Sequence, residues 1–214
     1  MRNRSLSLVC ATSLLCLASL AHADEGWYVS GQAGASILTS SELDDPTGIL
    51  AALGTEINFD VGYGLSGALG YHWGLFRVEG EITYAESDID EVEVVGIGFS
   101  GSGDVSSLGF MANAFKDFEI GDGWQFNIGG GIGYAIVSIN DASVGGVPLA
   151  DDDDWVFAYQ LGTGIGYQMS PETTLSLDYR YFATVDPEFS AVDGIPFEAE
   201  YDSHVIRIGV RFNF

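Results

Sequence analysis

The stretch HVIRIGVRFNF, His204 to Phe214, alternates strictly between two kinds of side chain. His, Ile, Ile, Val, Phe and Phe fall on one side of an extended strand, and Val, Arg, Gly, Arg and Asn fall on the other, because successive side chains of a strand point to opposite faces. A strand with arginines on one face and aromatic or aliphatic side chains on the other cannot be buried on both faces. The pattern fits a transmembrane β-barrel, whose wall separates lipid from a polar interior.

The same alternation recurs in seven further segments. In Ile57 to Tyr71, odd positions are mostly large and apolar, whereas even positions are Asn, Asp, Ser, Ala and Gly. A soluble barrel would place its apolar residues inside, so that large Tyr and Trp side chains would crowd a narrow interior. We therefore predict an all-β, eight-stranded antiparallel up-and-down transmembrane barrel. The predicted strands are 27–38, 57–71, 75–85, 106–116, 124–139, 155–169, 174–182 and 204–214.

The connections between these segments alternate in length. Four are long, and their ranges are 39–56, 86–105, 140–154 and 183–201. Three are short, centred on 72–74, 117–123 and 170–173. Bacterial outer-membrane barrels have long extracellular loops and short periplasmic turns, so the sequence predicts this arrangement.

The composition excludes several classes of protein. The chain has 7 Lys+Arg and 31 Asp+Glu, and without Arg2 and Arg4 the net charge becomes 5 − 31 = −26. Such an acidic protein is not expected to bind nucleic acid, which needs basic side chains. A hydrophobic content of 47% excludes ordinary disorder, which combines high charge with low hydrophobicity.

Residues 1–23 have the features of a cleavable secretory signal peptide. Arg2 and Arg4 precede a short apolar run, and Ala21-His22-Ala23 supplies the small residues of a cleavage site. We predict cleavage after Ala23, which leaves residues 24–214 as the barrel domain. Both cysteines lie in the signal, so the mature domain has no disulfide and no thiolate metal site.

Several segments resemble a known family, the small outer-membrane β-barrels related to opacity proteins, surface antigens and the membrane domain of outer membrane protein A (porin-like barrels). The matching motifs are FRVEGE at 76–81, GGGIGY at 129–134, AYQLG at 158–162, YRYF at 179–182 and the final Phe214. The resemblance implies a bacterial outer-membrane location, contact with membrane lipids and lipopolysaccharide, and delivery by periplasmic chaperones. It also implies that Phe212 and Phe214 form an assembly signal read by the barrel assembly machinery.

The predicted interior carries equal numbers of positive and negative side chains. They are Arg77, Arg180, Arg207 and Arg211 with Asp60, Glu79, Glu81 and Asp178. An eight-stranded barrel is just wide enough for side chains to fill it, so these groups predict a hydrogen-bonded plug. The alternative is a narrow, weakly conducting ion path through rearranging pairs, with gaps left by inward glycines.

Most remaining acids fall in the four predicted loops, which contain no Lys or Arg. The densest run is Asp151-Asp152-Asp153-Asp154. A solvated, self-repelling surface is one interpretation. A Ca²⁺ or Mg²⁺ site is the alternative, because both ions prefer oxygen ligands, although the run lacks the spacing of an EF-hand loop. No other cofactor is predicted.

Enzymatic activity is not expected. The predicted mature chain has two histidines, and Ser203 and His204 point to opposite faces of one strand, which separates them as a catalytic pair. The sequence thus favours an outer-membrane barrel with a structural, surface-exposed role in envelope integrity and surface presentation. Two alternatives stay open: an adhesin or ligand-binding protein that uses the loops, and the narrow channel. The sequence names no extracellular ligand.

Overall fold

A computed structural model describes residues 25–39, 41–44, 56–94, 97–144, 147–190 and 196–214, so the predicted signal peptide and its cleavage site lie outside the described residues. These residues form twelve β-strands. The described part of the chain contains no helix that is long and apolar enough to cross a membrane. The strands are β1 (Glu25–Leu38), β2 (Ser41–Asp44), β3 (Glu56–Phe59), β4 (Gly62–Trp73), β5 (Phe76–Val94), β6 (Ile97–Gly121), β7 (Trp124–Val144), β8 (Val147–Gln168), β9 (Thr173–Thr184), β10 (Glu188–Ser190), β11 (Pro196–Ala199) and β12 (Asp202–Asn213).

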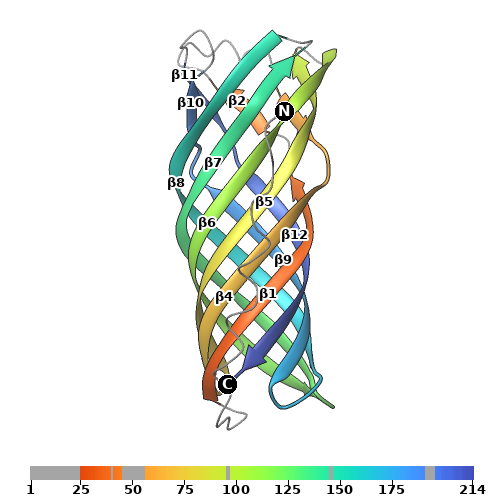
Figure 1. The fold of residues 1–214 in the computed structure, drawn as a ribbon, viewed down its shortest axis with the longest axis vertical. Coiled ribbons are helices and arrows are strands. Elements are labelled where there is room, and N and C mark those ends of the chain that lie inside the picture. The colour runs from red at the N-terminus through yellow and green to blue at the C-terminus, as the bar shows by residue number, and fades with distance from the viewer. Residues whose placement is uncertain (1–24, 40, 45–55, 95–96, 145–146, 191–195) are drawn as a thin grey trace, which may run out of the picture.

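Eight of these strands close into a barrel, which confirms the predicted fold (Figure 1). The order around the wall is β1-β4-β5-β6-β7-β8-β9-β12, and every neighbouring pair is antiparallel. The last strand closes the barrel on the first, with Gly31 opposite Val210 and Ala33 opposite Ile208. Closure matters in a bilayer because lipid offers no partner for the free edge of a sheet.

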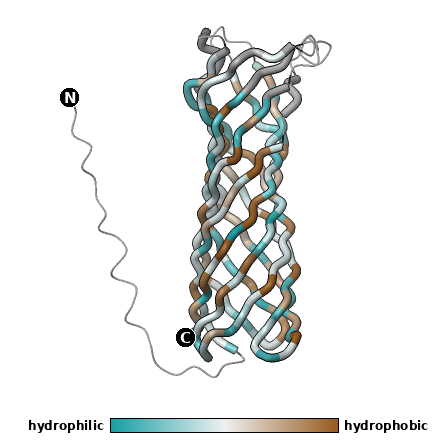
Figure 2. Tube along the Cα trace, turned by 90° about the vertical axis from the view of Figure 1, so that its right-hand side faces the viewer, coloured by the Kyte–Doolittle hydropathy of each residue, from teal (hydrophilic) through white to brown (hydrophobic). Residues whose placement is uncertain are grey.

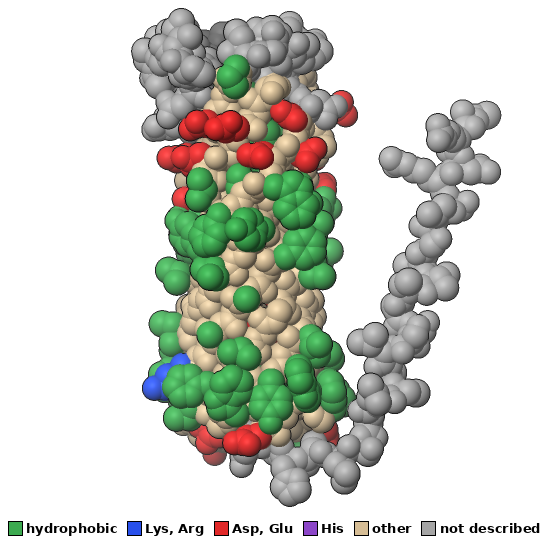
Figure 3. Space-filling model, turned by 90° about the vertical axis from the view of Figure 1, so that its left-hand side faces the viewer, with side chains coloured by type: hydrophobic (Ala, Val, Ile, Leu, Met, Phe, Trp, Pro, Cys, Tyr) green, Lys and Arg blue, Asp and Glu red, His purple; other side chains and the backbone are tan. Residues whose placement is uncertain are grey.

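The part of the wall nearer Glu25 and Phe214 has apolar residues outside and polar residues inside. On β12, Ile206 and Ile208 are more than half exposed, whereas Arg207 between them is 2% exposed. Figure 3 shows two bands of hydrophobic side chains on the outer surface, separated by a zone of small residues and backbone, as the girdles of a transmembrane barrel require. The lower band includes Trp27, Tyr71 and Trp124, and the upper band includes Tyr134 and Trp155.

Beyond the upper band the pattern inverts. On β5 the outward positions change from apolar residues to Glu86, Asp88 and Asp90, while the inward positions become Ala85 and Ile89, both of which are buried. The same inversion occurs on β7, whose inward Val137 and Ile139 are buried. The alternation of the strands is continuous, so the inversion marks where the outer surface leaves lipid and enters water.

The strands β5 to β8 continue well past the upper band and form one half of an extension (Figures 1 and 2). The other half is built from β3, β2, β11 and β10, which are hydrogen-bonded in that order starting from β5. We call this region the extension; its described parts are 41–44, 56–59, 86–94, 97–106, 137–144, 147–154, 188–190 and 196–199. The wall of the extension is therefore built from partly different strands than the wall of the barrel below it. The strands β5 to β8 belong to both walls, whereas β3, β2, β11 and β10 belong only to the extension.

Several predicted boundaries are therefore wrong. Much of the predicted loops 86–105 and 140–154 is strand, because β5 pairs with β6 as far as Val94 opposite Ile97, and β7 with β8 as far as Val144 opposite Val147. The predicted strand 57–71 is divided at Asp60 and Val61, where β3 ends before β4 begins. The predicted turn 117–123 is mostly β6, and only two residues separate β6 from β7.

Candidate functional site: the barrel interior

Seven of the eight charged residues predicted for the interior lie there. Arg77, Glu79 and Glu81 come from β5, Asp178 and Arg180 from β9, and Arg207 and Arg211 from β12. Asp60 does not join them, because the chain leaves the regular ladder between β3 and β4 and Asp60 is exposed there. All of them are buried except Arg211, which is slightly more accessible.

Glu81 is the centre of the first group of contacts. Arg207 Nη1 donates to Glu81 Oε1 at 2.8 Å across the interior. Asn113 on β6 and Gln160 on β8 donate to Glu81 Oε2 at 2.7 and 2.8 Å. A buried carboxylate that accepts one charged and two neutral hydrogen bonds is well compensated for its lost hydration. Four strands are thereby joined through a single side chain.

A second group surrounds Arg77, nearer the lower girdle. Arg77 Nε donates to Asp117 Oδ1 at 3.2 Å, and Arg77 Nη1 lies 3.6 Å from Glu79. The hydroxyl of Tyr28, a fully buried residue of β1, donates to Glu79 at 2.6 Å. Arg211 lies 3.9 Å from Asp117. Asp117 therefore takes the place predicted for Asp60, and the interior holds four arginines against four carboxylates.

Sequence reasoning missed Asp117 and Tyr28 for different reasons. Asp117 falls in the predicted turn 117–123, although it continues the inward series Met111, Asn113 and Phe115 by one further step of two residues. Extending that alternation would have found it. Tyr28 occupies an inward position on β1, but a tyrosine near a predicted strand end is ordinarily read as part of a girdle.

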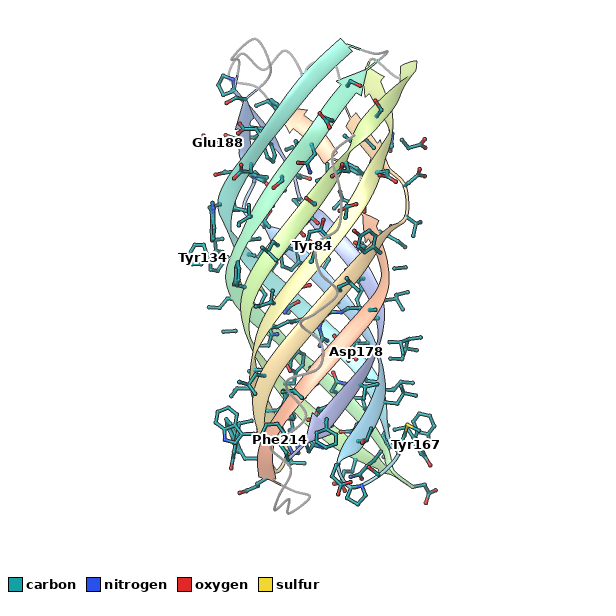
Figure 4. All side chains as sticks on the ribbon, viewed as in Figure 1. Tyr84, Tyr134, Tyr167, Asp178, Glu188 and Phe214 are labelled. Carbon is teal, nitrogen blue, oxygen red and sulfur yellow. The ribbon has the colours of Figure 1, made fainter. Side chains whose placement is uncertain are left out.

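The third group lies around Asp178, which is labelled in Figure 4. Gln32, Ser176 and Asn127 donate to its carboxylate at 2.9, 2.6 and 3.4 Å. Arg180 Nη1 lies 3.9 Å from Asp178, too far for a good hydrogen bond.

The guanidinium of Arg180 is also stacked on an aromatic ring. Its Cζ lies 4.5 Å from the centroid of the Phe115 ring, and Arg77 Cζ lies 4.3 Å from the same centroid. Two cations on one buried ring combine packing with cation–π attraction. Phe115 therefore links the group around Arg77 to the group around Asp178.

Inward glycines make room for these side chains instead of leaving gaps. A Cβ on Gly162 would lie 2.1 Å from Arg180 Nη1, and a Cβ on Gly131 would lie 1.9 Å from Asn113 Oδ1. In each case the glycine is opposite the large residue on the neighbouring strand. The pairing of large with small residues lets long polar side chains lie flat against the wall of a narrow barrel.

Above the polar groups the interior becomes apolar. Met111, Phe182, Val137, Ile139 and Phe189 belong to one buried cluster that continues into the extension. Tyr201, just before β12, donates to Ser107 Oγ at 2.8 Å, and burial raises the pKa of Tyr201 to about 12. This hydroxyl therefore stays protonated at physiological pH. The interior thus consists of a polar layer below and an apolar layer above.

Two small cavities lie in the interior. One lies in the polar layer beside Gln32, Arg77 and Asp178, and one lies in the apolar layer beside Phe59 and Phe189. Each has a volume of about 20 Å³, enough for roughly one water molecule. Neither cavity forms a continuous path through the described part of the barrel.

The acidic run 151–154 lies at the start of β8 and not in a loop. Asp152 Oδ2 accepts a hydrogen bond from the backbone N–H of Ser190 at 2.9 Å, and Asp154 Oδ2 accepts one from that of Glu188 at 3.0 Å. These two side chains attach β10 to β8, whereas Asp153 is exposed between them. Among the described residues, no group of three or more His, Cys, Asp or Glu side chains could hold a metal ion.

The two histidines outside the predicted signal peptide lie far apart in the barrel. His72 Nε2 is 3.4 Å from Asp117 near the lower girdle, and His204 Nδ1 is 2.7 Å from the Tyr179 hydroxyl on the outer face. His204 and Ser203 point to opposite faces, as their burial indicates. The absence of enzymatic activity stays a prediction.

Comparison with known proteins places the chain in a family. Residues 7–214 match the family described as "Outer membrane protein beta-barrel domain", and the chain belongs to that family. It is 27% identical over 164 residues to the "22 kDa outer membrane protein" of Rhizobium leguminosarum bv. viciae, covering 71% of this chain and 67% of the relative. The protein is thus a bacterial outer-membrane β-barrel.

Two solved structures show the same fold. The outer membrane protein OprG from Pseudomonas aeruginosa has a TM-score of 0.56 at 15% identity, with 88% of this chain and 97% of that chain covered. Neisserial surface protein A has a TM-score of 0.52 at 19% identity, with the same coverage of both chains. Because both sequence identities are below 25%, the structural similarity shows a shared fold and nothing about a shared function.

Proposed function

We propose that this protein is a closed outer-membrane barrel that holds a folded, acidic extension at the cell surface, with a structural role in envelope integrity and surface presentation. The observation that carries the proposal is the filling of the interior in two successive layers, one polar and one apolar. A diffusion channel needs a continuous water path, and the charged groups here are paired with each other instead of lining one.

The extension supports the surface role. Its described outward side chains include Asp88, Asp90, Asp153, Glu188 and Glu198, all of them exposed. Its interior contains Ile89, Val137, Ile139 and Phe189. An apolar interior and a charged exterior are what a folded element in water requires. The extension is therefore a packed structure that presents a fixed acidic surface.

Conductance across a planar bilayer tests the closed lumen. We expect no discrete current steps from the folded protein purified from outer membranes. Steps that change in size or ion selectivity when Asp178 is replaced by Asn would show a conducting lumen and overturn the proposal. Steps that are unchanged by Asp178→Asn would come from a contaminating porin, because Asp178 lies inside this barrel.

A strain without the protein tests the envelope role. We expect greater sensitivity to detergent, which the intact chain reverses. A variant with residues 188–199 replaced by a short Gly-Ser linker separates the two parts of the proposal. This variant should restore detergent resistance if the barrel alone supports the envelope. It should leave the strain sensitive to detergent if the extension is required.

Recognition of a cationic partner is a second candidate function, favoured by the absence of Lys and Arg from the described extension. Capture of whole cells on immobilised polylysine would test it. The expected result is capture that weakens with salt, as screening requires, and that falls when Asp88, Asp90 and Asp153 are replaced by Asn. Capture that is independent of these residues would reject this candidate.

A further inference from the structure

The outer surface carries a groove in the half of the wall nearer the periplasm. It has a volume of about 880 Å³, and its floor is formed by four small outward residues of three neighbouring strands, Gly80, Ala112, Ala114 and Gly130. Larger side chains form its edges; they include Trp27, Leu69, Tyr71, Val78, Ile132 and Leu161. The wall faces lipid at this depth, so the groove opens into the hydrocarbon of the bilayer.

A basic side chain lies just beyond the lower end of this groove, outside its lining. Lys116 is the next outward residue below Ala114 on β6, and its Nζ lies 4.9 Å from the Phe118 ring centroid and 5.8 Å from that of Phe76. Both rings are exposed on the lower girdle. In the view of Figure 3, the only basic atoms on the outer surface lie at the level of the lower hydrophobic band.

Lys116 is unusual in this chain. Of the seven basic residues, Arg2 and Arg4 belong to the predicted signal peptide, and the four other arginines belong to the interior groups described above. Lys116 has no ion pair within the described residues, although the chain is strongly acidic. A lysine at this depth extends its ammonium toward the headgroup region, where lipid phosphates lie.

The groove is long enough to hold a large part of one acyl chain. From Lys116 to Ala112 the strand advances four residues, or about 13 Å at 3.3 Å per residue, which is roughly 10 Å along the membrane normal at a strand tilt of about 35–45°. One leaflet accounts for about 15 Å of the 30 Å hydrocarbon core. We infer that this surface is a binding site for a phospholipid of the periplasmic leaflet, with its phosphate on Lys116 and an acyl chain lying in the groove over Ala114, Ala112 and Gly80.

A second groove on the same wall provides an internal control. It has a volume of about 570 Å³ and is lined by outward residues such as Gly31, Ala33, Gly67 and Ile208. Neither lining contains a basic residue, but only the first groove ends next to Lys116. The two grooves share small floors and a lipid-facing position. They differ in the positive charge that Lys116 places at one end of the first groove. This charge is the feature that would make the first groove a specific phospholipid site.

Native mass spectrometry of the protein, extracted from outer membranes in a mild detergent, tests the inference by counting retained phospholipids. We expect one retained phospholipid, and a roughly fivefold weaker retention for Lys116→Gln, because a basic residue near the surface contributes about this much attraction for anionic lipid. Lys116→Arg should retain the lipid. Equal retention in the wild type and Lys116→Gln would overturn the inference.

Filling the groove tests the acyl-chain contact separately. Gly80→Leu should reduce retention, because a Cβ at Gly80 meets no atom within 4 Å and the new side chain projects into the groove. Gly31→Leu, equally open, fills the other groove and should leave retention unchanged. Equal effects of both variants would overturn the site, as would a protein dimer that Gly80→Leu dissociates, since a second copy would then be the occupant. Heat-modifiable migration on gels confirms that each variant is folded.

Discussion

Glu81 and Arg207 approach to 2.8 Å across the barrel interior, although β4 and β1 lie between their strands in the wall. Both side chains are 2% exposed, so neither charge is hydrated by bulk water. The pair connects two parts of the wall that share no backbone hydrogen bonds. The interior network thus braces the barrel from within, in addition to filling it.

Breaking this pair on one side should strongly destabilise the barrel. Arg207→Leu leaves Glu81 buried without its cation, which costs about 3–5 kcal/mol when one partner of a buried pair is removed. The double variant Glu81→Leu/Arg207→Leu removes both charges and should recover part of the loss. Urea unfolding in lipid vesicles, followed by tryptophan fluorescence, measures both values. A cost under about 1 kcal/mol for the single variant would contradict the bracing role.

Gly162 should not tolerate a side chain. Gly162→Ala places a methyl group against the guanidinium of Arg180, which is held by Phe115 and cannot move away freely. Overpacking of this kind costs about 1–3 kcal/mol. Gly80→Ala is the matched control, since its methyl group meets no neighbour and projects toward lipid. Equal stabilities of the two variants would indicate that the interior near Arg180 is loosely packed.

The cost of a lipid-facing arginine should depend on its depth. Leu177→Arg lies between the two girdles and should cost about 2–4 kcal/mol, whereas Val185→Arg lies beyond the end of β9 and should cost about 0–1 kcal/mol. Both native residues are exposed and apolar, at 44% and 58%. The same unfolding assay compares them. Similar costs at the two sites would place the boundary of the membrane above Val185.

The aspartates that attach β10 to β8 should protect the extension from proteolysis. Asp152→Ala and Asp154→Ala each remove a carboxylate that accepts a backbone N–H of β10, so cleavage within 186–200 should become faster. Asp153→Ala removes a charge without such a contact and serves as the control. Limited proteolysis of intact cells, with mass spectrometry of the fragments, gives the rates. Repeating it in Ca²⁺ and in NaCl of matched ionic strength separates a specific cation site from screening.

Phe212 and Phe214 should be required for efficient assembly. The Phe214 N–H donates to the Trp27 carbonyl at 2.9 Å and completes the junction of β12 with β1, and the Phe212 side chain is 41% exposed toward lipid. Replacing both by Ala should lower the yield of heat-modifiable barrel in cells while export to the periplasm continues. Replacing both by Tyr should preserve assembly. A normal yield from the Ala variant would reject these residues as an assembly signal.

The strands and their facing were predictable because a period of two is a local property. Arg207 lies inward and Ile208 outward as their positions in HVIRIGVRFNF require. The extension was missed because acidic residues in 86–105 resemble a solvated loop, and only pairing with distant segments shows that Ser87 and Ile89 face a core. No local pattern reveals that β2 would pair with β11.

The interior network was predictable in composition but not in its contacts. Alternation identifies which side chains point inward, and seven of the eight charged residues predicted for the interior lie inside the barrel. It does not show which carboxylate meets which arginine, because partners such as Glu81 and Arg207 come from strands that are not neighbours. Asp60 was not placed correctly because it lies at the break between β3 and β4, where the regular alternation is interrupted and its side chain is exposed.

The pairing of β2 with β11 also has a consequence for the order of folding. It joins Leu43 to Ala199, residues from opposite ends of the chain, at the edge of the extension. Contacts between such distant segments form late, since the entropy of closing a long loop is lost before they stabilise anything. The membrane wall brings these segments together by closing β1 on β12. We therefore expect the extension to complete its own wall only after the barrel has closed, as a separate and slower step of maturation at the cell surface.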